Sequence, residues 1–281
     1  MLLGMNLLLW TRSVTADHRA LLDALAETGY DGVELPVLDG TAEAYRNIGK
    51  QLDDLGLRRT GITVLGPDKS CISDAAAVRQ AALDHIRWAI DCLELAGGEV
   101  LVGPYHQPLF QIHGKPPTPI EIERLVDVHR RAAEHAAEAG IRLAVEPLNR
   151  FECYVCTTAA QAAELVAEVD RPNYGFLYDT FHANIEEADP VGSLRRHLGA
   201  IGHVHLSEND RGSPGKGHVP WEKTLRTLKS SGYAGWCVIE SFGRRPMNPG
   251  PNVRIYRDIC ASDKEVYVEG HDFLRELWEK V

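Results

Sequence analysis

Four residues that could bind a hard metal ion stand at the ends of four apolar runs in the second half of the chain. Glu146 follows "IRLAV", Asp179 closes "YGFLYD", His205 lies in "AIGHVHLS" and Glu240 in "GWCVIES". Three carboxylates and an imidazole at one place would repel one another if left bare, because crowded like charges cannot all remain ionised. A divalent cation resolves that conflict. The oxygen-rich set favours Mn²⁺, Mg²⁺ or Co²⁺ in an open octahedral site over a structural zinc.

A single acidic residue at a strand end is more often a helix N-cap than a ligand, and this reading applies to Asp179 taken alone. Four independent caps rarely converge on one point, however. The metal site therefore depends on a fold that brings the four strand ends together.

Strand-like apolar runs alternate with helical patterns along the whole chain. The expected strands are residues 5–10, 32–37, 59–66, 99–104, 141–146, 174–179, 200–207 and 235–241; the expected helices are 16–29, 41–55, 74–98, 118–139, 157–169, 187–198, 221–231 and 263–280. Eight such units of roughly 30 residues predict an α/β fold, a (β/α)8 TIM barrel that forms a single domain over residues 1–281. Sites of such barrels lie at the carboxyl ends of the strands, where the two longer loops, 104–117 and 207–220, are also expected.

Alternate strand residues share a face, so a second layer is expected beneath the four ligands. It would consist of Ala144, Leu177, His203 and Val238, pointing into the barrel core. At that depth His203 is expected to be a hydrogen-bonded core histidine and not a ligand. His106, which follows the fourth strand, is interpreted either as a substrate contact or as an exposed loop histidine.

Composition excludes several classes of function. The formal net charge is −10, and the chain has no block of basic residues, which opposes nucleic-acid binding. No apolar run approaches the roughly 18 residues of a membrane span. The start "MLLGMNLLLW" lacks a basic leader, and the six cysteines, including the pair Cys153 and Cys156, are expected to be reduced thiols. A cytoplasmic protein is therefore expected.

Four segments carry a family resemblance: "EPLNRFE", "LYDTFHANIEE", "GHVHLSENDRGSPGKGHVPW" and "VIESF". They resemble motifs of the D-tagatose/D-psicose (ketose) 3-epimerase family, within the xylose-isomerase-like TIM barrels. The likeness is dense from residue 144 to 242 and thinner over "GYDGVEL" and "GITVLGP". The resemblance implies that Glu146, Asp179, His205 and Glu240 hold one divalent metal per subunit, most often Mn²⁺.

The same resemblance implies how a sugar binds. Residues matching His182 and Arg211 bind the sugar's oxygens, the one matching Glu152 contacts the substrate near its reacting end, and Trp10 matches an aromatic position of the pocket wall. A small sugar is then the substrate. We also expect a homo-oligomer, a dimer or a tetramer.

The implied chemistry is epimerisation at C3 of a ketose. A metal that chelates O2 and O3 polarises the C2 carbonyl, makes the C3 proton acidic and stabilises a cis-enediolate. If Glu146 and Glu240 face each other across the sugar, one removes the proton and the other returns one to the opposite side. Two alternatives stay open: an aldose–ketose or hydroxypyruvate-type isomerase on the same metal site, and a non-catalytic sugar-binding barrel.

The chain departs from the family where substrates are distinguished. Members often carry a tyrosine where this chain has Asn6 and a tryptophan where it has Leu109 or Phe110. The wall around C4–C6 is therefore expected to be more polar or more open. Arg244 and Arg245 follow the last strand, where many barrels bind phosphate, so a phosphorylated sugar is an alternative substrate.

Overall fold

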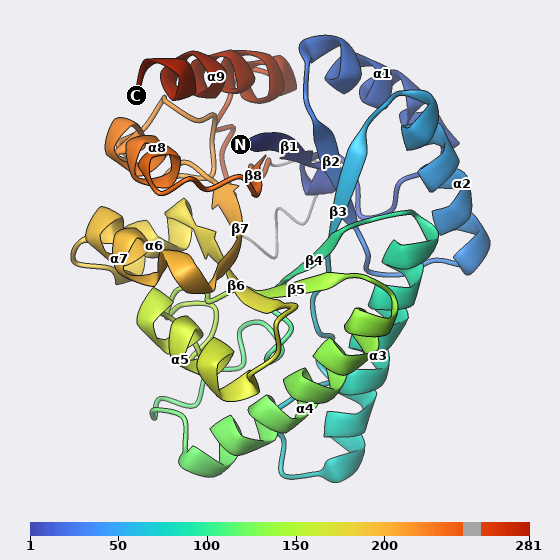
Figure 1. Ribbon diagram of the computed structural model, residues 1–281, viewed down its shortest axis with the longest axis vertical. Coiled ribbons are helices and arrows are strands. Elements are labelled where there is room, and N and C mark those ends of the chain that lie inside the picture. Colours follow the sequence, from blue (N-terminus) through green and yellow to red (C-terminus); the bar gives the residue numbers. More distant parts are fainter. Residues whose placement is uncertain (244–253) are drawn as a thin grey trace.

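The computed structural model describes residues 1–243 and 254–281, and its strands form a closed barrel (Figure 1). Within those residues, eight parallel strands pair in chain order, and the last pairs with the first. They are β1 Leu2–Asn6, β2 Gly32–Pro36, β3 Arg58–Ile62, β4 Val100–Gly103, β5 Arg142–Val145, β6 Tyr174–Asp179, β7 Ile201–Leu206 and β8 Trp236–Ile239. The closed sheet confirms the predicted (β/α)8 barrel.

Helices surround the strands on the outside of the barrel (Figure 1). They are α1 Arg19–Thr28, α2 Ala42–Asp54, α3 Ala76–Leu95, α4 Pro119–Glu138, α5 Ala159–Val169, α6 Thr180–Glu186, α7 Pro190–His197, α8 Trp221–Ser230 and α9 Gly270–Lys280. The long connections predicted after the fourth and seventh strands are confirmed, because β4 and β7 are each followed by more than ten residues before the next helix.

Several helices begin at a capping residue that the sequence makes visible. The hydroxyls of Thr41, Thr118 and Thr158 accept hydrogen bonds from main-chain N–H groups in the first turns of α2, α4 and α5. In α4 the carboxylate of Glu121 also accepts from the main-chain N–H of Thr118, which completes a capping box. These side chains satisfy N–H groups that lack partners within the helix, so they fix where each helix starts.

Much of the barrel interior below the strand ends is apolar. A cluster of buried side chains fills it: Leu8, Ile62, Val100, Val102, Ala144, Leu177, Trp236, Val238 and Phe242. It contains three of the four residues predicted for the layer beneath the ligands, and the fourth, His203, is also fully buried. Burial of this apolar surface stabilises the closed sheet and leaves a dry floor under the polar rim.

Several predicted elements have the wrong extent; the third strand, for example, ends at Ile62 and not at Gly66. The first strand ends at Asn6 and not at Trp10, because the Asn6 side chain accepts a hydrogen bond from Leu8 N (2.8 Å) and starts the 3₁₀ turn η1, Leu7–Leu9. The helix expected at 187–198 corresponds to α7 alone, and the helix before it, α6, was not predicted. α6 starts at once after β6, and α7 follows at Pro190.

Two observations bear on the environment of the chain. All six cysteines are free, as predicted, and five of them are buried. Cys153 donates a hydrogen bond to the carbonyl oxygen of Cys156, and burial raises the pKa of its thiol to about 12. In the described parts of the chain, none of the helices combines the length and the apolarity that crossing a bilayer requires.

Candidate active site

The four predicted ligands lie together at the carboxyl ends of β5 to β8. One ligand atom from each of Glu146, Asp179, His205 and Glu240 lies within 4.8 Å of the others, and all four residues are buried. Each lies within one residue of the end of its strand. Neighbouring parallel strands thus bring together side chains that are up to 94 positions apart in the sequence, since 240 − 146 = 94.

Charge in this cluster is poorly compensated by the protein alone. Burial, followed by repulsion from Glu240, raises the pKa of Glu146 well above its usual range. Burial also opposes ionisation of Glu240, but His205 and Arg211 outweigh it and lower the pKa of that carboxyl. Burial opposes a charged His205 as well, yet Glu240 and Glu34 raise the pKa of the imidazole. The three carboxylates compete for the positive charge available.

Two polar atoms at the centre of the cluster are orphaned. Among the residues that the structure describes, neither Glu146 Oε1 nor His205 Nδ1 has a hydrogen-bond partner, although both are buried. His205 Nδ1 lies 3.5 Å from Glu240 Oε2 and 3.9 Å from both Glu146 Oε1 and Asp179 Oδ2. Buried polar atoms without partners are rare and call for an explanation. A divalent cation fits this donor set, because three carboxylate oxygens and one imidazole nitrogen converge on it.

Arg211 lies beside the same carboxylates. Its Nη1 donates to Asp179 Oδ2 (2.9 Å) and to Glu240 Oε2 (2.5 Å), and its guanidinium stacks on the rings of Phe181 and Phe242. The residue has a left-handed backbone (φ 67°). Main-chain N–H of Phe242 donates to its carbonyl oxygen, so the end of β8 holds that conformation in place.

His182 and Glu152 meet through Asn149. The main-chain N–H of Asn149 donates to His182 Nδ1 (3.0 Å), and its side-chain amide donates to Glu152 Oε1 (2.7 Å). His182 Nε2 lies 3.0 Å from Arg211 Nη2 and 3.6 Å from Glu146 Oε1. Burial and then the charge of Arg211 lower the pKa of His182 well below its usual value, so the ring is neutral.

A cavity of about 400 Å³ opens above the cluster. Its polar end is formed by Glu146, Glu152, His182, Arg211 and Glu240. The rest of its lining is mostly apolar: Leu8, Arg12, Leu38, Ile62, Val64, Leu65, Gly66, Pro67, Pro104, Pro108, Leu109, Phe110, Leu148 and Phe242. Three of the four predicted sugar-binding residues therefore line the same cavity as two of the predicted ligands.

Two residues assigned to the cavity wall lie elsewhere. Trp10 does not line the cavity: its Nε1 donates to Asp263 Oδ2 (2.7 Å) and its ring packs edge-on against Tyr267, because η1 turns the chain away from the strand direction. Asn6 is fully buried beneath the carboxylates. Asn6 does not line the cavity, so the expectation of a more polar or more open wall around C4–C6 finds no support at this position. Arg244 and Arg245 lie outside the described residues.

Sequence reasoning missed Glu34, a fully buried carboxylate on β2. It lies 2.8 Å from His205 Nε2 and 3.1 Å from His203 Nε2, which places His203 below the rim, as expected. Burial opposes its ionisation, but His205 and then His203 outweigh that effect and lower its pKa. The signal was present in "GVELP", where one charged residue interrupts an apolar strand.

Two further buried residues bond to the main chain next to the cluster. His106 is fully buried, so it is neither exposed nor at the substrate: its Nε2 lies 3.1 Å from the carbonyl oxygen of Glu146. Burial lowers its pKa to about 4, so the ring is neutral. Glu208 is also fully buried and accepts hydrogen bonds from Gly215 N, Val219 N and Trp221 Nε1, which fastens the loop after β7.

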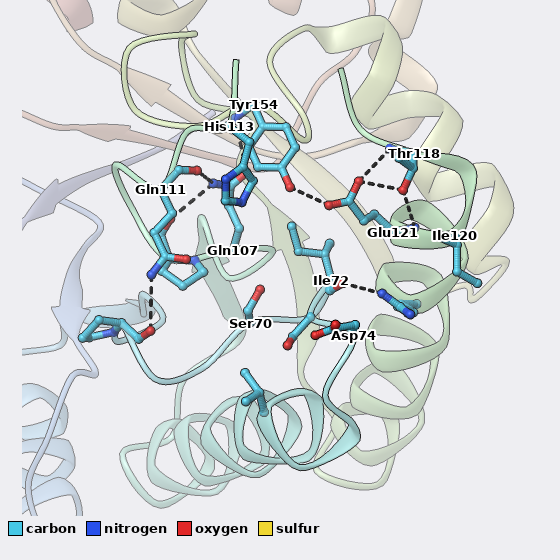
Figure 2. Close-up of a pocket in the computed structure, with 15 residues that line it drawn as sticks. Ser70, Ile72, Asp74, Gln107, Gln111, His113, Thr118, Ile120, Glu121 and Tyr154 are labelled. Carbon is cyan, nitrogen blue, oxygen red and sulfur yellow. Dashed lines mark hydrogen bonds between the residues drawn. The ribbon is translucent and has the colours of Figure 1, made fainter. Parts of the chain in front are cut away.

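Figure 2 shows a second cavity, of about 540 Å³. Pro67 and Pro108 line both this cavity and the first. The polar groups of the second cavity largely bond to one another. Figure 2 shows Tyr154 Oη donating to Glu121 Oε1, and the opposite oxygen of that carboxylate accepting from Thr118. The predicted catalytic residues lie in the first cavity only.

Known proteins resemble this chain over almost its whole length. The family model described as xylose isomerase-like TIM barrel matches residues 22–277. A probable ketose 3-epimerase of Synechocystis sp. is 27% identical over 286 residues, with 98% of this chain and 96% of that protein covered. A ketose 3-epimerase of Arthrobacter globiformis is 28% identical over 279 residues, with coverage of 98% and 96%.

A solved structure extends the comparison to three dimensions. The D-allulose 3-epimerase of Methylomonas sp., in complex with D-allulose, superimposes with a TM-score of 0.91 at 26% identity. The match covers 98% of this chain and 96% of that one. These findings confirm the resemblance seen in the sequence motifs.

Proposed function

The chain belongs to the xylose isomerase-like TIM barrel family and is a sugar epimerase, and we propose that it inverts free ketoses at C3. One observation carries the proposal: Glu146 and Glu240 stand on β5 and β8, the two outer strands of the four that bear the cluster, and both line one cavity. A sugar bound over the cluster would meet one glutamate from each side. An epimerase needs such a pair, because the proton leaves one face of the carbon and another arrives at the opposite face.

We propose that Glu146, Asp179, His205 and Glu240 hold one divalent ion per subunit, with Mn²⁺ the best match to an oxygen-rich open site and Mg²⁺ or Co²⁺ also suited. When bound, the ion polarises the ketose carbonyl and stabilises the negative charge that develops when C3 loses its proton. The orphaned atoms Glu146 Oε1 and His205 Nδ1 support this assignment.

The chain's own residues position the sugar and move the proton. An ionised glutamate accepts the C3 proton as a cis-enediolate forms, and the glutamate opposite, which enters the step protonated, donates its proton to the other face. The two glutamates thereby exchange protonation states, and proton exchange with water restores them before the next turnover. His182 Nδ1 accepts from the main-chain N–H of Asn149, and His182 Nε2 lies 3.0 Å from Arg211 Nη2, so the ring and the guanidinium stand together at the polar end of the cavity, where a sugar oxygen would meet both. Arg211 and Glu152 offer a donor and an acceptor beside it.

A free sugar fits the cavity better than a phosphorylated one. Of the described lining residues, only Arg12 and Arg211 are cationic, and Arg211 is already bonded to Asp179 and Glu240. The far wall is apolar, and loss of one apolar contact changes discrimination by only about 1–3 kcal/mol. Broad tolerance at C4–C6 is therefore expected among free ketohexoses and ketopentoses. Activity confined to terminal phosphates would overturn this part of the proposal.

The test is isotope incorporation in D₂O with Mn²⁺ present. A ketohexose should gain deuterium at C3 together with formation of the C3 epimer. Formation of an aldose with label at C1 or C2 would instead assign the chain to the aldose–ketose isomerases, which need only one productive base.

Variants separate the two bases. Glu146→Gln and Glu240→Gln should each lower kcat by about 10³-fold or more, because each removes a proton acceptor that acts in the transition state. Circular dichroism should show a folded barrel in both. Near-normal turnover in either folded variant would mean that the two-base assignment is wrong.

A further inference from the structure

A fully buried carboxylate lies beneath the metal-binding cluster and has no part in the chemistry described above. Each oxygen of Glu34 accepts a hydrogen bond from a side chain of a neighbouring strand, and one histidine nitrogen lies close to each oxygen. Oε1 accepts from Asn6 Nδ2 (3.0 Å) and lies 2.8 Å from His205 Nε2; Oε2 accepts from Thr60 Oγ1 (2.8 Å) and lies 3.1 Å from His203 Nε2. Side chains from β1, β2, β3 and β7 therefore converge on one point inside the barrel.

This arrangement determines which ring nitrogen of His205 carries the proton. A carboxylate ion can only accept hydrogen bonds, so the ring nitrogen that faces Glu34 must carry a proton. The other nitrogen, Nδ1, faces Glu240 Oε2 at 3.5 Å and has no hydrogen-bond partner within residues 1–243 and 254–281. In the neutral ring, its lone pair then points into the cluster of carboxylates, which is the orientation that a metal ligand requires.

The same network reaches a second member of the cluster. Asn6 Nδ2 donates to Glu34 Oε1 and to Glu240 Oε1, each at 3.0 Å, while Asn6 Oδ1 accepts from Leu8 N. Both ends of the amide are thus fixed. Glu34 and Glu240 are connected through one side chain whose orientation η1 determines.

We propose that Glu34 is a positioning residue for the metal site: it holds His205 in the tautomer with the proton on Nε2 and, through Asn6, fixes the carboxylate of Glu240. The proposal rests on the proposed metal site but not on which sugar is bound. Glu34 is not part of the four-residue cluster, because it faces Nε2 of His205, whereas the other three carboxylates lie near Nδ1. Carboxylates that orient a metal-binding histidine typically contribute 10–100-fold to metal affinity.

The first test uses the unaltered protein. ¹⁵N NMR of the Mg²⁺-loaded chain, with the His205 resonances assigned by their loss in His205→Gln, reports which ring nitrogen carries the proton. We expect the proton on Nε2 and coordination through Nδ1. A proton on Nδ1, or coordination through Nε2 towards Glu34 and His203, would overturn the proposal, since the latter is the outcome if those three residues were themselves a metal site.

The second test is a pair of variants titrated with Mn²⁺ in the absence of sugar. In Glu34→Gln an amide replaces the carboxylate. In one orientation its NH₂ group faces Asn6 Nδ2 and His205 Nε2, and in the other it faces Thr60 Oγ1, so in either case a donor meets a donor. Mn²⁺ affinity should fall about 10–100-fold. Thr60→Val is the matched control, because it removes one donor from Glu34 Oε2 without touching His205, and it should change Mn²⁺ affinity less than about 3-fold.

These outcomes separate a positioning role from a structural one. A purely structural Glu34 would lower the unfolding temperature of Glu34→Gln and leave Mn²⁺ affinity and the His205 tautomer unchanged, which would overturn the proposal. If Glu34→Gln does not fold, the NMR measurement on the unaltered protein still decides. Neither readout involves a sugar, so failure of the proposed epimerase reaction would leave both results intact.

Discussion

His182 shows how the proposed sugar contacts can be separated from the metal contacts. Its Nε2 lies on the cavity side, 3.6 Å from Glu146 Oε1, but the ring is not part of the four-residue cluster. His182→Ala should therefore lower kcat/KM by about 10–100-fold, the cost of losing one or two hydrogen bonds to the substrate. Mn²⁺ affinity should stay within about 3-fold, because no ligand is lost.

Steady-state kinetics and Mn²⁺ titration check this prediction together. His113→Ala is the control, since His113 is exposed and, of the two cavities, lines only the second. The kinetics of this variant should match those of the unaltered protein. A parallel loss of Mn²⁺ affinity in His182→Ala would place His182 among the metal-binding residues instead.

At this scale the sequence predicted residues that lie at strand ends and missed those that lie inside strands. Glu146 and Asp179 stand out because each is a charge at the end of an apolar run. Glu34 could not be placed, since its partners His203 and His205 are about 170 positions away and the alternation of a strand does not say which strands face each other. Trp10 was misplaced because the Asn6 side chain accepts a hydrogen bond from Leu8 N, which ends the strand early.

The two carboxylate oxygens of Asp179 have different partners. Its Oδ1 accepts from Phe181 N (2.6 Å) and caps α6, and its Oδ2 faces the cluster. Asp179→Asn keeps an oxygen for the cap, whereas Asp179→Ala loses it. In the presence of chelator, the alanine variant should be less stable than the asparagine variant by about 1 kcal/mol, the usual worth of an N-cap. Both should bind Mn²⁺ much more weakly than the unaltered chain.

Urea unfolding and Mn²⁺ titration measure the two effects separately. Asp189 caps the neighbouring helix α7 through Gly192 N (2.9 Å) and takes no part in the cluster. Asp189→Ala should therefore cost about 1 kcal/mol of stability and leave Mn²⁺ affinity unchanged. Equal stability of the two Asp179 variants would show that the cap contributes nothing.

The order and type of the elements were predictable, while several boundaries were not. Threonine caps followed by periodic apolar residues located α4 and α5 to within a residue or two. The start of α6 was missed because its cap is the last residue of a strand, and no loop separates the two elements. The same residue ends a strand, starts a helix and belongs to the cluster, and only the structure shows all three.

Metal binding should stabilise the whole barrel as well as activate it. Residues from four strands contribute to the cluster, so an ion that binds only the folded chain shifts the unfolding equilibrium. At about 100 times its Kd, Mn²⁺ should add about 2.7 kcal/mol to the free energy of unfolding. Chelator should abolish turnover, and Mn²⁺ or Co²⁺ should restore it better than Zn²⁺. Full activity in the metal-free protein would contradict the proposed chemistry.

The acid sensitivity of the barrel should depend on a histidine between a helix and the sheet. His129 on α4 is fully buried: its Nδ1 lies 2.5 Å from Tyr174 Oη and its Nε2 3.3 Å from the carbonyl oxygen of Tyr105. Burial lowers its pKa to about 3, and repulsion from His106 acts in the same direction. Near neutral pH both folded and unfolded states are uncharged here. Below about pH 6.5 only the unfolded chain takes up the proton, so stability is lost as pH falls towards 3.

Between pH 7 and pH 5 this single group should remove about 2 kcal/mol from the free energy of unfolding. His129→Gln has no proton to take up in that range. Its own pH 7 to pH 5 loss, measured by urea unfolding in chelator, should therefore be smaller than that of the unaltered chain by about 2 kcal/mol. His218→Gln, at an exposed position, is the control and should lose as much stability as the unaltered chain. Equal losses in all three proteins would show that His129 does not stay neutral in the folded barrel, and that the packing between α4 and the sheet tolerates its charge.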